Sequence, residues 1–475
     1  MSGPVPAINE VPVAPASPEA FRPLLGERYA EVEAAIGAAS RVLDGRTVWH
    51  VNSTARGGGV AEMLRSLLAY AHGAGVDVRW LTIAGNGEFF QITKRIHNQL
   101  HGASGDGGEL GEAERAVYER NLVASAEELR ALVRPGDIVY LHDPQTAGLI
   151  PLMRAAGTHV VWRCHVGLDD PNEIARSAWA FLLPYVKEAD AYVFSRRAFA
   201  WDGLDERRLW LVAPSIDVFS PKNQELGAGA VAAILAAAGL AEPDGEAPVF
   251  VRQSGARARV ERRAELDQEG AVPADAPLVA QVSRWDRLKD PSGVLRCFAE
   301  GVVHGGAHLL LAGPSVDGVA DDPEGAAVLA EVRAERARLP GGVRARVHLA
   351  CLPMDDVDEN AAMVNAIQRR ADVVVQKSIA EGFGLTVAEA MWKARPVVAS
   401  RIGGIQDQIV DGESGLLVDP ADLDATALAI DGLLGDRARA EAIGAAARER
   451  VRGSFLGTRH LVQYMELIEK MLDGE

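Results

Sequence analysis

The feature that most constrains this fold is a repeated alternation of short apolar runs with segments of helical periodicity. In the first half of the chain the apolar runs are residues 47–53, 76–85, 137–144, 159–166, 191–195 and 209–217. Between most of them apolar residues recur at helical spacing, as in 60–75, which ends at a glycine. Such continuous apolar runs indicate strands buried on both faces, so we predict a parallel sheet covered by helices.

A second series of the same kind begins near residue 277. Its apolar runs are residues 277–286, 307–314, 346–353, 371–378, 396–404 and 414–420. A chain of 475 residues is too long for one ordinary core. We therefore expect an α/β protein with two doubly wound, Rossmann-like domains that face each other across a cleft at the carboxyl ends of their strands.

The expected domain limits follow from these two series. Residues 1–40 form a proline-rich arm and a helix, 41–275 the first domain, 276–455 the second, and 456–475 an amphipathic helix that could cross back to the first domain. The stretch 252–270 is strongly charged and carries no strand pattern. We interpret it as an inserted helical segment or a connection between domains, with a solvated helix face as the simplest explanation of its charge.

Composition excludes several classes of function. A net charge of −17 and a pI near 5.2 argue against binding to nucleic acid or to an anionic membrane. Cys164, Cys297 and Cys351 fit neither a disulfide framework nor a zinc site. Cys164 and Cys351 lie in apolar runs, so we expect them to be small buried side chains, which suits a reducing compartment. With no signal-peptide pattern and no run near the ~20 apolar residues of a membrane helix, we expect a cytoplasmic protein.

The stretch EGFGLTVAEA (381–390) has the composition of a ligand site. Thr386 and Glu389 have the spacing of a capping box, which predicts a helix start and is the plain explanation of Glu389. Glycines beside Phe383 permit close approach of a ligand, and the amides of Leu385 and Thr386 would then lie at the positive end of a helix. We predict a phosphate site here, with the two glutamates binding sugar or ribose hydroxyls.

Basic and glycine-rich segments could complete such a site. Arg284 and Lys289 follow an apolar run and could balance a diphosphate, although solvated surface side chains are the alternative. ARGGG (55–59) joins a predicted strand to a helix, so Gly58 and Gly59 could approach a phosphate or a sugar; a flexible turn is the alternative.

Three further polar residues end predicted strands of the first domain. His165 follows one strand, and His142 and Asp143 end another, where ligands of doubly wound sheets bind. A structural role is the alternative for His165. The acidic doublets 169–170, 321–322 and 355–356 share no spacing, so no metal is assigned to them.

The motifs resemble a known family. SRWDRLKDP (283–291) and EGFGLTVAEA (381–390) resemble the phosphate and nucleotide-sugar signatures of retaining GT-B glycosyltransferases of family 4. HVNSTARGGGVAEML (50–64), WRCHVGLDDPN (162–172) and APSIDVFSPKNQ (213–224) are similar to the trehalose synthases of that family and to the related trehalose phosphorylases.

The resemblance implies a role for each candidate residue. Arg284 and Lys289 would hold the donor diphosphate, Glu381 the donor glucose, and Glu389 the ribose. In the second half of the chain, the backbone of Gly384, Leu385 and Thr386 would face the phosphate, and the base would lie near Leu352 (350–353). In the first half, Gly58 and Gly59 would lie over the diphosphate, His165 would contact the sugar, and Asp143 would contact the acceptor.

The implied activity is transfer of glucose, with retention, from a nucleoside-diphosphate glucose such as UDP- or ADP-glucose to glucose or a similar sugar. No metal and no further cofactor are expected, the partners are donor and acceptor sugars, and a homodimer is compatible with the resemblance. Trehalose phosphorylase, a transferase with a cyclitol or amino-sugar acceptor, and a two-domain sugar-binding protein remain alternatives.

Overall fold

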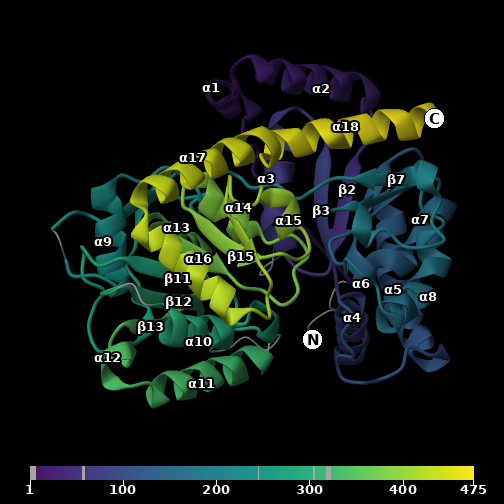
Figure 1. Ribbon diagram of the computed structural model, residues 1–475. Helices are drawn as coiled ribbons and strands as arrows, with labels where there is room; N and C mark the ends of the chain where they lie inside the picture. The colour runs from purple at the N-terminus through teal and green to yellow at the C-terminus, as the bar shows by residue number, and fades with distance from the viewer. Residues whose placement is uncertain (1–6, 56–58, 244, 303–304, 317–322, 475) are drawn as a thin grey trace, which may run out of the picture. The chain divides into compact units, whose positions relative to one another are not determined.

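The computed structural model describes residues 7–55, 59–243, 245–302, 305–316 and 323–474. The chain forms two compact units, Met1–Ser215 together with Gly457–Glu475, and Ile216–Leu456 (Figure 1). Residues 216–275, which we expected in the first domain, thus belong to the second unit. Each unit is a Rossmann-like α/β domain, as the alternating pattern predicts.

The first unit is built on a seven-stranded sheet in the order β1-β3-β2-β4-β5-β6-β7. All neighbours are parallel except β1, which pairs antiparallel with β3. Its strands are β1 (Ile8–Val11), β2 (Val48–Asn52), β3 (Val78–Ile83), β4 (Ile138–His142), β5 (His159–Cys164), β6 (Ala191–Phe194) and β7 (Leu209–Leu211). The strand order reverses between β2 and β4, which makes their carboxyl ends the switch point of this sheet.

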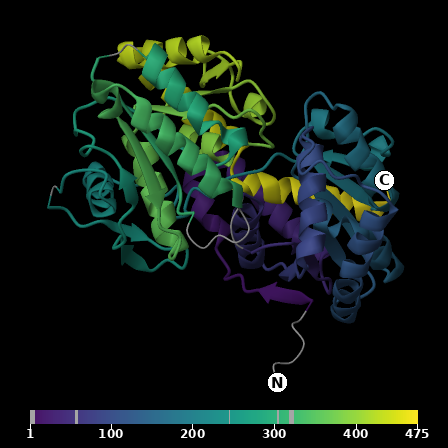
Figure 2. The same cartoon turned by 90° about the horizontal axis from the view of Figure 1, so that it is seen from below.

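Helices cover both faces of the first sheet because its strands are apolar on both sides. One core cluster contains Phe89, Leu122 and Phe181, from α4 (Gly87–Leu100), α5 (Glu112–Leu132) and α8 (Glu173–Val186). The other contains residues of α2 (Tyr29–Val42), α3 (Gly59–Gly73) and α18 (Gly457–Asp473). The carboxyl-terminal helix α18, drawn in yellow, packs along α2 and α3 (Figures 1 and 2).

The second unit has its own seven-stranded sheet, in the order β10-β13-β12-β11-β14-β15-β16. Its parallel strands are β11 (Leu278–Val282), β12 (His308–Pro314), β13 (Val347–Leu352), β14 (Val373–Gln376), β15 (Val397–Ser400) and β16 (Leu416–Val418). Read in sequence order, the parallel strands have the 3-2-1-4-5-6 arrangement of dinucleotide-binding domains, with the switch point between β11 and β14.

The helices of the second unit follow the same alternation. The longer ones are α9 (Ala228–Ala238), α10 (Pro291–Gly301), α11 (Pro323–Arg338), α13 (Val357–Arg370), α14 (Leu385–Trp392), α16 (Leu423–Gly435) and α17 (Arg437–Ser454). Two single-turn helices, α12 (Gly341–Arg344) and α15 (Ile405–Gln408), lie between them. The core contains side chains of α10, α11, α16 and α17 packed against the strands. Two loops, after β11 and after β14, therefore meet at the switch point of the sheet.

The charged stretch 252–270 differs from the prediction. It is not helical; it contains β9 (Arg257–Arg259), which pairs with β8 (Val249–Val251), and β10 (Glu265–Asp267), which pairs antiparallel with β13. Its charges are also not simply solvated, because the Arg252 guanidinium forms two bonds of 2.9 and 2.7 Å to the Asp356 carboxylate at the start of α13. Ion pairs thus attach this segment to the start of α13 within the second unit.

Cys164 and Cys351 are buried, as their apolar runs predict, and Cys297 is buried as well. Burial raises the pKa of the Cys164 thiol well above its ordinary value and that of Cys297 to about 12. Across the described ranges, no helix has the length and apolar character needed to cross a membrane.

Candidate functional site

The first candidate site lies at the switch point of the second unit. After β11 the chain forms a short 3-10 helix, η6 (Arg287–Lys289), which Asp286 caps by accepting the N–H of Leu288 at 2.8 Å. The Gln281 side-chain amide donates to the carbonyl of Lys289 at 2.9 Å and holds this loop against the end of β11. These bonds place the Lys289 side chain beside the loop that follows β14.

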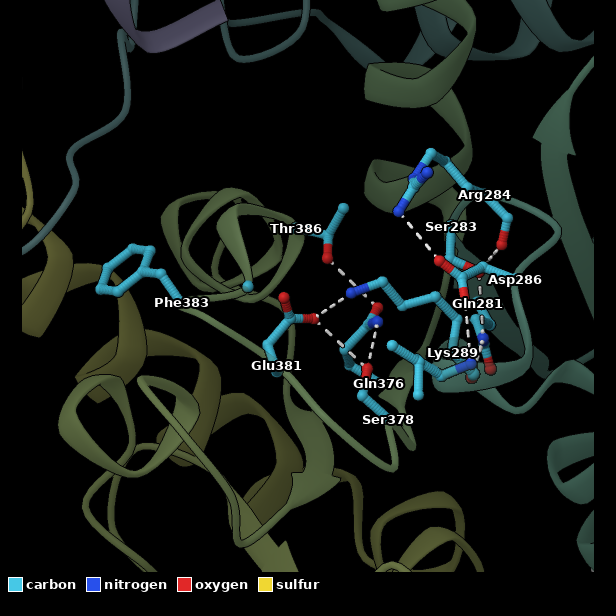
Figure 3. A network of polar contacts seen from close by, with 12 residues as sticks. Gln281, Ser283, Arg284, Asp286, Lys289, Gln376, Ser378, Glu381, Phe383 and Thr386 are labelled. Atoms are coloured by element: carbon cyan, nitrogen blue, oxygen red, sulfur yellow. Dashed lines mark hydrogen bonds and ion pairs between the residues drawn. The ribbon is translucent and has the colours of Figure 1, made fainter. Parts of the chain in front are cut away.

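An ion pair joins the two loops (Figure 3). The Lys289 Nζ lies 2.5 Å from Glu381 Oε2, and only 17% and 11% of the two side chains are exposed. The structure therefore brings together two residues that the sequence assigned to one site, 92 positions apart. An ammonium carries three N–H groups, so Lys289 can retain this bond and also donate to phosphate oxygens.

A chain of hydrogen bonds from the second loop reaches the same oxygen of Glu381. Thr386 Oγ1 donates to Gln376 Oε1 at 3.1 Å, Gln376 Nε2 donates to Ser378 Oγ at 3.0 Å, and Ser378 Oγ donates to Glu381 Oε2 at 3.3 Å (Figure 3). Gln376 and Ser378 are buried, and the sequence analysis missed both. The signal was their place in the polar end of the run 371–378, where Gln376 ends β14 and Ser378 follows it.

The helix start differs from the predicted capping box. Helix α14 begins at Leu385, and its N-cap is Gly384 in a left-handed conformation with φ 82°, with no side-chain capping bond. Thr386 instead bonds Gln376, and Glu389 lies on the buried face of the helix. The capping-box prediction is therefore wrong, because the left-handed Gly384 is the N-cap, two positions before the N-cap that a box of Thr386 and Glu389 requires.

A second glycine shapes the Glu381 loop. Gly403 has φ 46°, and a Cβ atom placed there would lie 1.8 Å from the Glu381 carbonyl oxygen. Only glycine allows the two backbone segments to approach this closely. Gly403 lies three residues after the end of β15 (Val397–Ser400), in the glycine pair that ends the run 396–404 of the sequence.

Three other predicted site residues of the second unit contact partners other than Lys289 and Glu381. The Arg284 guanidinium donates to Asp286 at 2.9 Å with half of its side chain exposed. Glu389 is 1% exposed, with Lys222 Nζ 3.6 Å from its Oε1. Leu352 ends β13 with a buried side chain and accepts the N–H of Ser315 at 2.7 Å through its carbonyl.

The second candidate site lies at the switch point of the first unit. Asp143 follows β4 in a left-handed conformation with φ 63°, and its Oδ1 accepts the backbone N–H of His165 at 2.8 Å. Burial raises the pKa of Asp143 to about 7 and holds that of His165 well below its ordinary value. Of the predicted glycines, Gly59 is the exposed first residue of α3, and Gly58 lies outside the described residues.

Within the described ranges, no three His, Cys, Asp or Glu side chains gather as metal ligands would. Asp169 pairs with Arg196 at 2.9 Å, and Asp356 pairs with Arg252. The doublet 321–322 lies outside the described residues.

Two Rossmann-like domains, with a cation, a carboxylate and a helix start at a switch point, define a GT-B glycosyltransferase. The fold of an α,α-trehalose-phosphate synthase (UDP-forming) from Burkholderia xenovorans, solved in complex with glucose-6-phosphate, agrees. It superposes with a TM-score of 0.66 at 17% identity, covering 90% of this chain and all of that one. The family "Glycosyl transferases group 1" matches residues 262–450, and the chain is a glycosyltransferase.

The chain belongs to the trehalose synthase family. The family "Trehalose synthase, N-terminal domain" matches residues 50–201. A trehalose synthase of Rubrobacter xylanophilus is 37% identical over 455 residues, covering 94% of both chains, and one of Pyrococcus horikoshii is 34% identical over 95% of this chain and 96% of its own. A trehalose phosphorylase of Pleurotus pulmonarius is more distant, at 26% identity over 79% of this chain and half of its own.

Proposed function

We propose that the enzyme transfers glucose from a nucleoside-diphosphate glucose to the anomeric hydroxyl of glucose, with retention, in the manner of family 4. The product is trehalose. The observation that carries the proposal is the Lys289–Glu381 ion pair beside the start of α14. It offers a cation and helix amides to a diphosphate, and a carboxylate to sugar hydroxyls, within one small region.

In the second unit, Lys289 and Arg284 bind the diphosphate together with the backbone of Gly384, Leu385 and Thr386. Glu381 binds hydroxyls of the transferred glucose. Because Ser378 and Lys289 both donate to its Oε2, the orientation of its carboxylate is fixed before the donor arrives. Glu389 binds the ribose, and the base lies near Leu352.

In the first unit, His165 contacts the transferred sugar, Asp143 an acceptor hydroxyl, and Gly58 and Gly59 the diphosphate. The support is the match of residues 50–201 to the trehalose synthase N-terminal family and the place of these residues after β2, β4 and β5.

The chemistry needs no protein nucleophile. The acceptor oxygen bonds to C1 on the face from which the diphosphate leaves, the C1–O bond to phosphate breaks, and the acceptor proton passes to the departing phosphate oxygen. Lys289 stabilises the charge that develops on the diphosphate, and the fixed carboxylate of Glu381 orients the sugar.

A matrix of donors and acceptors tests the proposal. UDP-, ADP- and GDP-glucose are each offered with glucose, a cyclitol or an amino sugar, and the product is identified by mass and by the anomeric couplings in its NMR spectrum. With glucose as acceptor we expect a disaccharide whose single linkage joins two anomeric carbons, both in the α configuration. We also expect the enzyme to retain most of its activity after EDTA treatment. Product formed from glucose 1-phosphate but from no nucleotide sugar would indicate a phosphorylase, and binding without turnover would indicate a sugar-binding protein.

A further inference from the structure

Three histidine side chains form a row at the switch point of the first sheet. His50 lies in β2, His142 ends β4, and His165 follows β5, so they come from three neighbouring strands. His50 Nδ1 lies 3.1 Å from His142 Nε2, and His142 Nδ1 lies 3.1 Å from His165 Nε2. The middle ring therefore uses both of its nitrogens to bridge the other two.

The row is packed tightly. The rings of His50 and His142 stack at 5.3 Å between centroids, and those of His142 and His165 at 5.4 Å. The His50 ring also stacks on Tyr140 at 4.6 Å. His50 and His142 are buried and His165 is half-buried, so the row runs from the core to the accessible end of β5.

Burial and a neighbouring cation keep the row neutral. Desolvation is the main cause that lowers the pKa of all three imidazoles, and the charge of Arg163 adds to it. Arg163 is opposite His142 in the pairing of β4 with β5, is fully buried, and donates to the Val212 carbonyl at 3.0 Å. It also contacts His460 and Tyr464 of α18.

Neutral imidazoles in such a row cannot choose their tautomers independently. Each has one N–H and one bare nitrogen, and each contact needs one of each. If His50 Nδ1 carries the proton, His142 must carry its proton on Nδ1 and His165 on its own Nδ1. If His50 carries it on Nε2, His142 and His165 both carry theirs on Nε2, and His165 Nδ1 is a bare acceptor.

We propose that His142 and His50 are positioning residues that fix the ring orientation and the tautomer of His165. His165 Nδ1 is the outer nitrogen of the row, so the buried end of the row determines whether this atom donates to or accepts from a sugar hydroxyl. The inference rests on the proposed contact of His165 with the transferred sugar. Packing alone does not explain why histidines occupy the row, because phenylalanine rings would fill the same space without buried polar atoms that need hydrogen-bond partners.

The second unit offers a matched control. His348 in β13 is fully buried, stacks on His308 at 5.1 Å, and also uses both nitrogens. His348 Nε2 lies 2.8 Å from His308 Nδ1, and His348 Nδ1 lies 3.3 Å from Gln268 Oε1. His348→Phe therefore removes the same chemistry from a site that no step of the proposed reaction uses.

Ring ¹⁵N NMR of the full chain, labelled at histidine, reads the tautomers directly. In the unaltered protein we expect His165 and His142 each to be neutral and in one tautomer, with the proton on Nδ1 in both rings or on Nε2 in both. In His142→Phe we expect His165 to populate both tautomers and kcat to fall about ten-fold, the lower end for loss of a partner that orients a functional histidine. The donor KM should change by less than about two-fold, because the bulk of the binding site is untouched.

The control and a second variant keep the test decisive. His348→Phe should leave the His165 tautomer and kcat unchanged. If His142→Phe does not fold, His50→Phe can replace it, because this variant removes only the buried end of the row. The spectrum of the unaltered protein tests the predicted single tautomer independently of both variants. Mixed tautomers of His165 in the unaltered protein, or an unchanged tautomer in His142→Phe or His50→Phe, would overturn the inference but leave the proposed reaction standing. Full activity of His165→Asn would instead reject the sugar contact itself.

Discussion

Substitution of Lys289 and Glu381, singly and together, tests whether their ion pair acts as one unit. At 2.5 Å, with an effective dielectric constant of 20, the Coulomb attraction is about 6.6 kcal/mol. Desolvation of two mostly buried charges offsets much of it. We therefore expect a net coupling of about 1.5–3 kcal/mol, the range of a hydrogen bond between charged groups.

The same coupling should appear in the kinetics. Loss of one charge stabiliser in Lys289→Met should lower kcat/KM by about 10²–10³, or about 2.7–4 kcal/mol. Glu381→Gln should cost about 1.5–3 kcal/mol through its weakened contact with the sugar. Independent residues would give about 4–7 kcal/mol in the double variant, whereas a coupled pair gives a value near that of Lys289→Met alone.

The assay is release of nucleoside diphosphate by the four proteins at subsaturating donor. Arg287→Met is the control, since Arg287 belongs to the same 3-10 helix and pairs with Glu331 at 2.6 Å, but both side chains are about half exposed. Its kcat/KM should stay within about two-fold. Additive costs in the double variant, or near-normal turnover of a folded Lys289→Met protein, would refute the reasoning.

Three further predictions concern other residues. Glu389→Gln should raise the Kd of free nucleoside diphosphate about ten-fold, because it weakens a charge-assisted hydrogen bond to the ribose, whereas Glu381→Gln should leave that Kd nearly unchanged. Calorimetric titration measures both values, and an equal loss of affinity in the two variants would contradict these separate roles. Burial raises the pKa of Asp143 from 3.8 to about 7, so the stability that it contributes is present at low pH and is lost as pH rises from about 4 to about 7. Asp143→Asn should therefore flatten the pH dependence of Tm between about pH 4 and pH 7, and an unchanged slope would contradict this reasoning. Arg252→Ala should lower Tm by about a few degrees at pH 7 without changing kcat, because it removes the ion pair with Asp356. Arg252 holds the pKa of Asp356 at about 2, so protonation of Asp356 at low pH removes the pair and the difference in Tm should shrink on acidification. A difference in Tm that does not depend on pH would contradict this reasoning.

The two-domain fold was predictable because it depends on patterns that are local in the sequence. Each apolar run that we interpreted as a buried strand lies in or around a strand of one of the two sheets. The charged segment 252–270 misled the interpretation, since short edge strands held by ion pairs lack the apolar pattern of central ones.

The candidate site was predictable in part, for a topological reason. Lys289 and Glu381 follow the first and fourth parallel strands of the second sheet, and the 3-2-1-4-5-6 order makes those strands neighbours. A reader who assigns that order from the sequence can place the two loops together, but not the 2.5 Å contact between them. Gln376 at the end of β14 and Ser378 in the loop act through their side-chain geometry, which no sequence periodicity predicts.

The contrast between Glu381 and Glu389 shows how far residue type alone can be trusted. Both are glutamates of one short motif, yet Glu381 lies in the loop before α14 while Glu389 lies on the buried face of that helix, 1% exposed, with Lys222 close by. A ribose that binds Glu389 must therefore reach a carboxylate that the protein already surrounds. Because the helix begins at a left-handed glycine, no capping role explains why a carboxylate lies at this buried position, where its desolvation is costly. That cost, rather than the capping pattern, is the physical argument for a functional role of Glu389.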